Sequence, residues 1–204
     1  MKKKTIALAL VLVMAFGVTM GGTFAYLTSQ TEVVTNTFTI GNVKITLDEV
    51  KVDVYGAPLT GNDAGRGTAN TYKLIPGHTY VKDPTIHVTK GSEEAWLFVK
   101  VVDEIVDIQD TKTVAAQMAA NGWFAVNGVD NVFAYNNKVD AREATEDIDI
   151  KVFENFKVLS TADVAAYAEK TITVQAYAIQ ADGFADAATA WAAAPATWTA
   201  PAQG

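Results

Sequence analysis

Apolar and polar residues alternate along much of the chain, which predicts β-strands. Within residues 38–54, Val43, Ile45 and Leu47 fall on one face while the residues between them are mostly polar. A period of two is typical of a strand with one buried face. Residues 95–106 are almost continuously apolar, as expected of a strand covered on both faces. Further strands are predicted at residues 79–89, 123–126, 131–135, 147–158 and 171–180.

Glycine, proline and asparagine mark the connections between these strands. Residues 55–70 are rich in Gly, Asn and Asp and predict a loop. Pro76-Gly77 has the composition of a type II turn, and Asn127-Gly128 predicts a hairpin between two short strands.

Three segments have helical character. Residues 110–120 are predicted to form a helix that Asp110 or Thr111 caps and that Gly122 ends. Its apolar face is expected to consist of Val114, Ala115, Met118 and Ala119. A helical turn is predicted within residues 160–168, and a helix at residues 185–193 that Pro195 ends.

Seven or more short strands with helical insertions predict an all-β fold, an antiparallel jelly-roll-like sandwich. The sandwich domain is expected to span residues 38–183. Residues 184–204 form an Ala/Pro-rich C-terminal tail.

The N-terminus has the pattern of a secretory signal peptide. Lys2, Lys3 and Lys4 precede an apolar run that is short for a membrane span, and small residues lead to Ala25. Cleavage is therefore predicted between Ala25 and Tyr26, with residues 1–25 removed. The product is expected to be secreted, without a membrane segment, in the extracellular matrix or at the cell surface. The alternative is an uncleaved N-terminal anchor.

Charge and composition narrow the function further. Removal of residues 1–25 takes away three lysines and no acidic residue, leaving 13 basic and 23 acidic residues and a net charge of −10. Such a chain is poorly suited to nucleic acid or to an anionic membrane surface, since both attract Lys and Arg. The chain has no cysteine, so it has neither a disulfide framework nor a thiol nucleophile.

No catalytic site, metal site or cofactor is predicted, and the chain is interpreted as a non-enzyme. The only histidines, His78 and His87, match no zinc-ligand spacing and are interpreted as a turn residue and a strand-surface residue. No G-x-S-x-G elbow, phosphate-binding loop or dinucleotide fingerprint is present.

One acidic stretch has two interpretations, a solvated loop or a calcium site, and the solvated loop is favoured. Its members are Asp140, Glu143, Glu146, Asp147 and Asp149.

The four tryptophans are also open to two interpretations. Trp96 and Trp123 are expected in the core, and Trp191 and Trp198 are expected to dock the tail onto the sandwich. The alternative is a sugar-binding platform.

The segment after the predicted cleavage site is prone to form a strand, because it is rich in Thr and Val and lacks Gly and Pro. It is either the first strand of its own domain or a strand that adds to the open sheet edge of a neighbour. It consists of Tyr26, Leu27, Thr28, Ser29, Gln30, Thr31, Glu32, Val33, Val34, Thr35, Asn36 and Thr37.

The chain has an N-terminal block at residues 21–28 and 36–47, a Pro-Gly segment at residues 74–88 and a strand-like segment at residues 171–181. Together these stretches resemble the TasA/camelysin family, which Gram-positive bacteria secrete and process with the signal peptidase SipW. The most specific is the N-terminal block, residues 21–28 and 36–47. Residues 74–88 are similar to the Pro-Gly turn that precedes a strand of the family, and residues 171–181 to its last strand.

The resemblance implies a jelly-roll subunit of biofilm-matrix fibres. Each subunit's N-terminal strand, here Tyr26 to about Thr37, would fill a groove in the next subunit, an arrangement called donor-strand complementation. The implied partners are other copies of the chain, a SipW-type signal peptidase and further matrix components. Some relatives are called metallo-endopeptidases, but this chain has no zinc-binding motif. A cell-surface glycan- or protein-binding module is the main alternative.

Overall fold

The computed structural model describes residues 42–194. These residues belong to the second of two compact units, residues 40–204. The predicted signal peptide, its cleavage site at Ala25 and Tyr26, and the strand-prone segment 26–37 lie outside the described residues.

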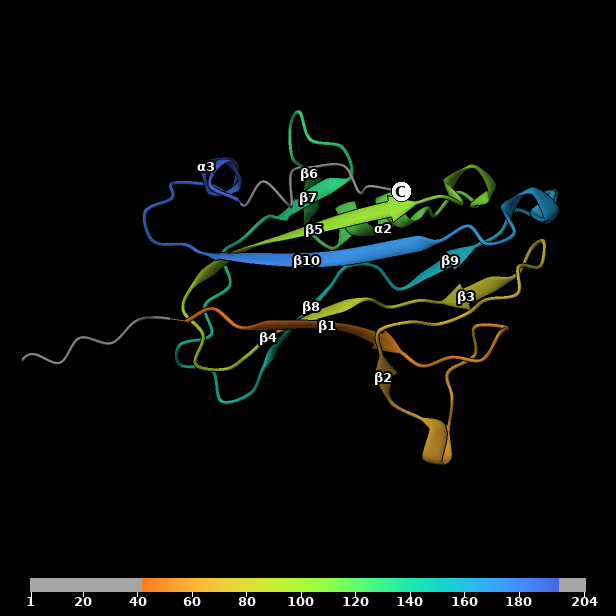
Figure 1. The fold of residues 1–204 in the computed structure, drawn as a ribbon, viewed down its shortest axis with the longest axis horizontal. Helices are drawn as coiled ribbons and strands as arrows, with labels where there is room; N and C mark the ends of the chain where they lie inside the picture. The colour runs from red at the N-terminus through yellow and green to blue at the C-terminus, as the bar shows by residue number, and fades with distance from the viewer. Residues whose placement is uncertain (1–41, 195–204) are drawn as a thin grey trace, which may run out of the picture. The chain divides into compact units, whose positions relative to one another are not determined.

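The described unit is an all-β antiparallel sandwich with short helical insertions, which confirms the predicted fold class (Figure 1). One sheet has the order β2-β1-β4-β8, a second has the order β10-β5-β7-β6, and β3 pairs with β9. The strands are β1 (Ile45–Val50), β2 (Arg66–Gly67), β3 (Thr79–Val81), β4 (Thr85–Val88), β5 (Ala95–Asp103), β6 (Trp123–Ala125), β7 (Val132–Tyr135), β8 (Ile148–Lys151), β9 (Asn155–Lys157) and β10 (Ile172–Gln180). The helices are α2 (Val114–Ala120) and α3 (Ala187–Ala192), with 3₁₀ turns η1 (Gly61–Asp63), η2 (Val106–Ile108) and η3 (Val164–Tyr167).

Two of the predicted strands are each interrupted. Residues 79–89 form β3 and β4, and residues 147–158 form β8 and β9. The pairing register is the same on both sides of the interruption: Val81 pairs with Asn155, and four residues further along, Thr85 pairs with Lys151. The two predicted strands therefore pair along one ladder that is broken in the middle.

Proline explains the interruption. The amide of Val152 donates to the carbonyl oxygen of Pro84 at 2.9 Å, but Pro84 has no N–H to return the bond. The carbonyl oxygen of Val152 instead accepts a hydrogen bond from Nδ2 of Asn121, at 3.1 Å. A side chain just after α2 thus supplies the donor that the proline removes.

Helix α2 begins later than predicted, and its buried face agrees with the prediction only in part. Its N-cap is Thr113, whose Oγ1 accepts a hydrogen bond from the amide of Ala116 at 3.2 Å, rather than Asp110 or Thr111. The buried residues are Val114, Gln117 and Met118, whereas Ala115 and Ala119 are exposed.

Gln117 is buried because its amide group bonds to β9 and to the residue before it. Its Nε2 donates to the carbonyl oxygen of Asn155 at 2.7 Å, and its Oε1 accepts from the amide of Glu154 at 3.2 Å. Apolar periodicity does not register such polar anchoring, which is why the prediction was right for Val114 and Met118 but missed Gln117.

The tail helix docks onto the outer face of the β10-β5-β7-β6 sheet, as predicted for Trp191. Asp186 and Thr189 form a capping box at the start of α3. Trp191 is buried against Phe98, with ring centroids 5.1 Å apart. Trp96 belongs to the same cluster and Trp123 to the main core between the sheets, which confirms their predicted burial. Trp198 lies outside the described residues.

Both predicted turns are present. The amide of His78 donates to the carbonyl oxygen of Ile75 at 3.1 Å, and Gly77 has φ +79°, as the second central residue of a type II turn requires. Strands β6 and β7 pair as a hairpin, and Gly128 in its connection has φ +76°.

Candidate functional site

Strand β10 has an open edge. Among the described residues its only neighbour in the sheet is β5. Hydrogen bonds at the two ends of this ladder, Glu104 N to Thr171 O and Ala181 N to Glu94 O, show that odd-numbered residues of β10 bond to β5. The backbone N–H and C=O groups of the even-numbered residues Ile172 to Gln180 therefore point away from β5, toward a position where no described strand lies.

Strand β1 also has an open edge over part of its length. It pairs with β4 along Ile45–Asp48, but β2 pairs only with Glu49 and Val50 on its other side. The bond from Thr89 N to Lys44 O shows that even-numbered residues of β1 bond to β4. The backbone groups of Ile45 and Leu47 consequently face outward, with no strand partner among the described residues.

These two open edges border the same groove. In Figure 1, β10 and β1 run side by side as neighbouring strands of different sheets, and residues of the two strands are in contact. A cavity of about 1140 Å³ lies in the seam between them. Its apolar lining includes Leu47, Leu74, Ile105, Phe156, Ile172 and Val174.

Aromatic rings support the groove from beneath. Tyr72 and Phe156 line the cavity, and their ring centroids are 5.3 Å apart in an edge-on arrangement. Phe156 stacks in turn on the fully buried Tyr80, at 4.9 Å. The hydroxyl of Tyr72 donates to the carbonyl oxygen of Val81 at 3.0 Å. Burial, and to a smaller extent the charge of Glu49, raises the pKa of Tyr72, so this hydroxyl stays neutral.

A buried ion pair also lines the cavity. Nζ of Lys82 lies 2.7 Å from Oε2 of Glu49, and both residues are more than 90% buried. Oε1 of Glu49 accepts a hydrogen bond from Nδ2 of Asn70 at 3.0 Å. The groove therefore has apolar side chains of β1 and β10 beside a buried ion pair, and Glu169 and Lys170 add further charged groups to its lining.

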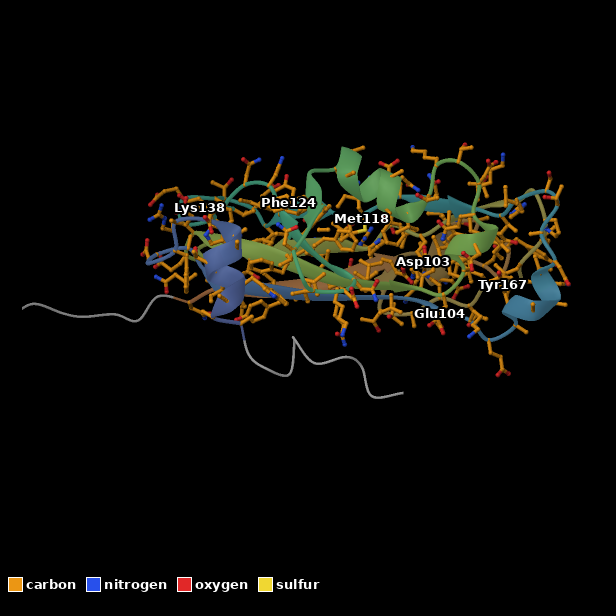
Figure 2. The ribbon with its side chains drawn as sticks, turned by 90° about the horizontal axis from the view of Figure 1, so that it is seen from above. Asp103, Glu104, Met118, Phe124, Lys138 and Tyr167 are labelled. Carbon is orange, nitrogen blue, oxygen red and sulfur yellow. The ribbon has the colours of Figure 1, made fainter. Side chains whose placement is uncertain are left out.

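The described unit has two distinct ends. Asn42, the first described residue, accepts a hydrogen bond from the amide of Glu93, and the neighbouring Glu94 pairs with Lys138 at 3.6 Å. Figure 2 shows Lys138 and Tyr167 at opposite ends of the unit. Tyr167 lines the cavity. Asn42 thus lies at the end of the unit away from the Tyr167 end of the groove.

A charged network lies beside β2. Nε2 of His87 is 2.8 Å from Oδ1 of Asp48, and Nδ1 is 2.6 Å from Oδ1 of Asp149. Arg66 bonds to both Asp48 and Asp83. Because ionised carboxylates only accept hydrogen bonds, both ring nitrogens of His87 donate when the ring is a cation. His87 is thus a surface residue of strand β4, as predicted, within an ion-pair network.

His87 should make the stability of the unit depend on pH. Burial lowers the pKa of His87, but hydrogen bonds and negative charge from Asp48 and Asp149 outweigh it, so the net pKa is raised above 6.5. The stabilisation is therefore fully present below the unfolded-state pKa and is lost as pH rises through the folded-state value. We expect the urea concentration at the midpoint of unfolding to decrease as the pH is raised from 6 to 9.

The matched control for this pH effect is His87→Gln, which removes the titrating group and keeps a polar side chain. The variant should be less stable at pH 6 and should show a flatter pH profile. Equal slopes in the two proteins would show that other groups cause the pH dependence.

Three members of the acidic stretch bond to neighbouring protein groups, and Glu143 and Glu146 are exposed. Asp140 pairs with Arg142, Oδ1 of Asp147 accepts from the amide of Lys90 at 3.0 Å, and Asp149 bonds to His87. Across residues 42–194, no group of three His, Cys, Asp or Glu side chains is arranged to hold a metal ion. His78 lies at a turn, as predicted, with Nε2 2.8 Å from the carbonyl oxygen of Tyr55.

Comparison of the chain with protein-family models, curated proteins and solved structures finds no match. In the described part of the chain, no helix is long and apolar enough to cross a membrane.

The sequence did not reveal the groove, because strand order decides which edges are open. One signal was present: Glu49 continues the inward-facing series of Ile45 and Leu47, where an apolar residue is expected. A charged residue in that position indicates a buried ion pair or a binding site.

Proposed function

We propose that this chain is a secreted structural subunit of extracellular fibres of the biofilm-matrix type. It polymerises head to tail when residues 26–37 of one copy pair as a strand in the groove of the next. The observation that carries the proposal is the pair of open strand edges, on β1 and β10, that face one cavity.

The groove suits a strand because its walls offer what a strand needs. Unpaired backbone groups on the open edge of β10 supply ladder hydrogen bonds, and the apolar side chains of β1 and β10 supply a surface for alternate side chains. Twelve residues extend over roughly 40 Å, and the nine residues of β10 over roughly 30 Å. Residues 26–37 contain no proline, so every residue can donate to a ladder.

The groove and the first described residue lie at opposite ends of the unit, which supports a filament rather than a closed dimer. Asn42, the first described residue, lies at the Lys138 end, whereas the groove reaches Tyr167 at the opposite end. A contact that joins one end of a copy to the other end of the next is heterologous, and repeating it without closure gives a filament.

Secretion is part of this proposal. It rests on the signal-peptide pattern of residues 1–25 and on the resemblance to the TasA/camelysin family. Cleavage between Ala25 and Tyr26 by a SipW-type peptidase would release Tyr26 as a free terminus for pairing.

The described residues do not favour the alternatives. Trp96, Trp123 and Trp191 are at most 8% exposed, so they offer no platform for a sugar ring. The two histidines lie in separate settings, His78 at a turn and His87 between two carboxylates.

Electron microscopy of two purified forms tests the proposal. One form begins at Tyr26 and the other near Phe38. We expect filaments from the first form and monomers from the second, because only the first carries the pairing strand. Filaments from both forms would exclude the N-terminal donor mechanism. Monomers from both, even when seeded with fibre fragments, would contradict the structural role.

A further inference from the structure

We propose that the buried pair Lys82–Glu49 selects the strand that fills the groove, by requiring a hydroxyl group opposite Nζ of Lys82. The hydroxyls are those of Ser29 and Thr31 in a second copy of the chain. This inference rests on the proposed function. It adds to that function which of the two faces of the incoming strand turns toward the groove.

Glu49 stands where the pattern of β1 calls for an apolar residue. Ile45 and Leu47 face the core, and Glu49 is next on the same face, with 5% of its surface exposed. A charged side chain that points inward from an edge strand opposes pairing with unselected apolar strands. The charged side chain of Glu49 therefore disfavours pairing of this edge with a strand that has only apolar side chains on its inward face.

Lys82 has hydrogen-bonding capacity left over. An ammonium group has three N–H donors, and among the described residues Nζ has one acceptor, Oε2 of Glu49. Lys82 lines the cavity, so solvent there can serve the other two donors. A strand that filled the cavity would displace this water, and an apolar side chain over Nζ would leave the donors unsatisfied.

The two faces of residues 26–37 differ in how they meet this requirement. One face carries Leu27 and Val33, separated by Ser29 and Thr31, so that two hydroxyls lie between two aliphatic side chains. This order suits the part of the groove where the buried pair Lys82–Glu49 lies beside apolar side chains such as Leu47.

The opposite face of the segment carries Gln30 and Glu32. Turned inward, Glu32 would bring a second carboxylate to a site where Glu49 already neutralises Lys82. Two carboxylates on one buried cation leave an uncompensated charge, which is strongly unfavourable. The phase with Ser29 and Thr31 inward is therefore selected.

Two double variants of the mature full-length chain test this inference. Ser29→Ala/Thr31→Val removes both inward hydroxyls with little change of shape. Thr28→Val/Gln30→Met is the matched control, because it removes two polar groups from the opposite face. We expect the critical concentration for polymerisation, measured by sedimentation, to rise at least about tenfold for the first and less than about twofold for the second.

A third variant links the effect to the ion pair. In the background Glu49→Gln/Lys82→Met, which removes both charges together, Ser29→Ala/Thr31→Val should no longer raise the critical concentration. Thermal unfolding of each protein verifies that the sandwich is intact. If this background fails to fold, the comparison of the two donor variants alone still tests the inference. Neither donor variant changes a residue of the described sandwich.

The outcomes separate this inference from the proposed function. Equal critical concentrations for the two donor variants, with polymerisation that still requires residues 26–37, would overturn the selection by Lys82 and leave the fibre role intact. Polymerisation that is independent of residues 26–37 would overturn both.

Discussion

The variant Ala176→Pro should stay folded and lose the ability to extend a filament. Ala176 is an even-numbered residue of β10, so its amide points to the open edge and not to β5. Proline there removes no bond of the β5–β10 ladder, at a cost to stability of about 1 kcal/mol from the altered φ. On the open side, it removes a donor and places a ring where the incoming strand must lie.

The control for this variant is Tyr177→Pro, one residue along the same strand. The amide of an odd-numbered residue bonds to β5. This proline therefore breaks the β5–β10 ladder near its middle and should strongly lower the midpoint temperature of thermal unfolding. The contrast tests the hydrogen-bonding phase of β10 directly. A lower thermal midpoint for Ala176→Pro than for Tyr177→Pro would mean that the open edge is assigned to the wrong side, and equal midpoints would contradict the alternation itself.

Mixing makes the prediction sharper, because Ala176→Pro alters the acceptor groove and leaves residues 26–37 unchanged. The variant should still donate its strand to the end of a growing filament and then block further addition. A small fraction of it mixed with the unaltered chain should shorten filaments seen by electron microscopy. Filaments of unchanged length at increasing fractions of the variant would argue against β10 as the acceptor edge.

Local patterns in the sequence predicted most strands and turns. Ile172, Val174 and Ala176 were assigned to one face of β10, and these residues do pack on the main core. The Pro76-Gly77 turn followed from two residues whose backbone preferences are narrow. Such features depend on neighbours in the chain, so a single sequence contains them.

Features that depend on distant residues were not predicted. Pro84 was inside a predicted strand, and its effect became clear only once Val152 was seen to be its partner. The buried face of α2 depends on Gln117 meeting β9. The groove depends on β1 and β10 being edge strands, which strand order decides and periodicity does not.

The largest loss of stability from a single methyl group is expected at Gly56. Its φ of +79° is unfavourable for any residue with a Cβ, and a Cβ placed there would lie 2.7 Å from Cα of Tyr80. The backbone of Tyr80 cannot move away easily, because Tyr80 is paired with Phe156 in the β3–β9 ladder. Strain and overpacking together should cost Gly56→Ala about 3–5 kcal/mol, a large share of the stability of a typical domain.

Gly61→Ala separates the two causes. Gly61 has a similar φ of +66°, but a Cβ there would meet nothing within 4 Å, so only the backbone cost of about 1 kcal/mol applies. Urea unfolding of both variants measures the difference, which is the contribution of the contact with Tyr80. A difference near zero would show that the segment around Gly56 moves away from Tyr80 at little cost.

The same pair of variants connects the core to the groove. Tyr80 stacks on Phe156, and Phe156 lines the cavity, so a displaced Tyr80 should disturb the surface on which the incoming strand packs. Gly56→Ala is therefore expected to impair polymerisation even at temperatures where the protein is folded, whereas Gly61→Ala, in a loop away from these rings, should polymerise normally. If folded Gly56→Ala polymerises as well as Gly61→Ala, the aromatic floor holds the fold together without shaping the binding surface.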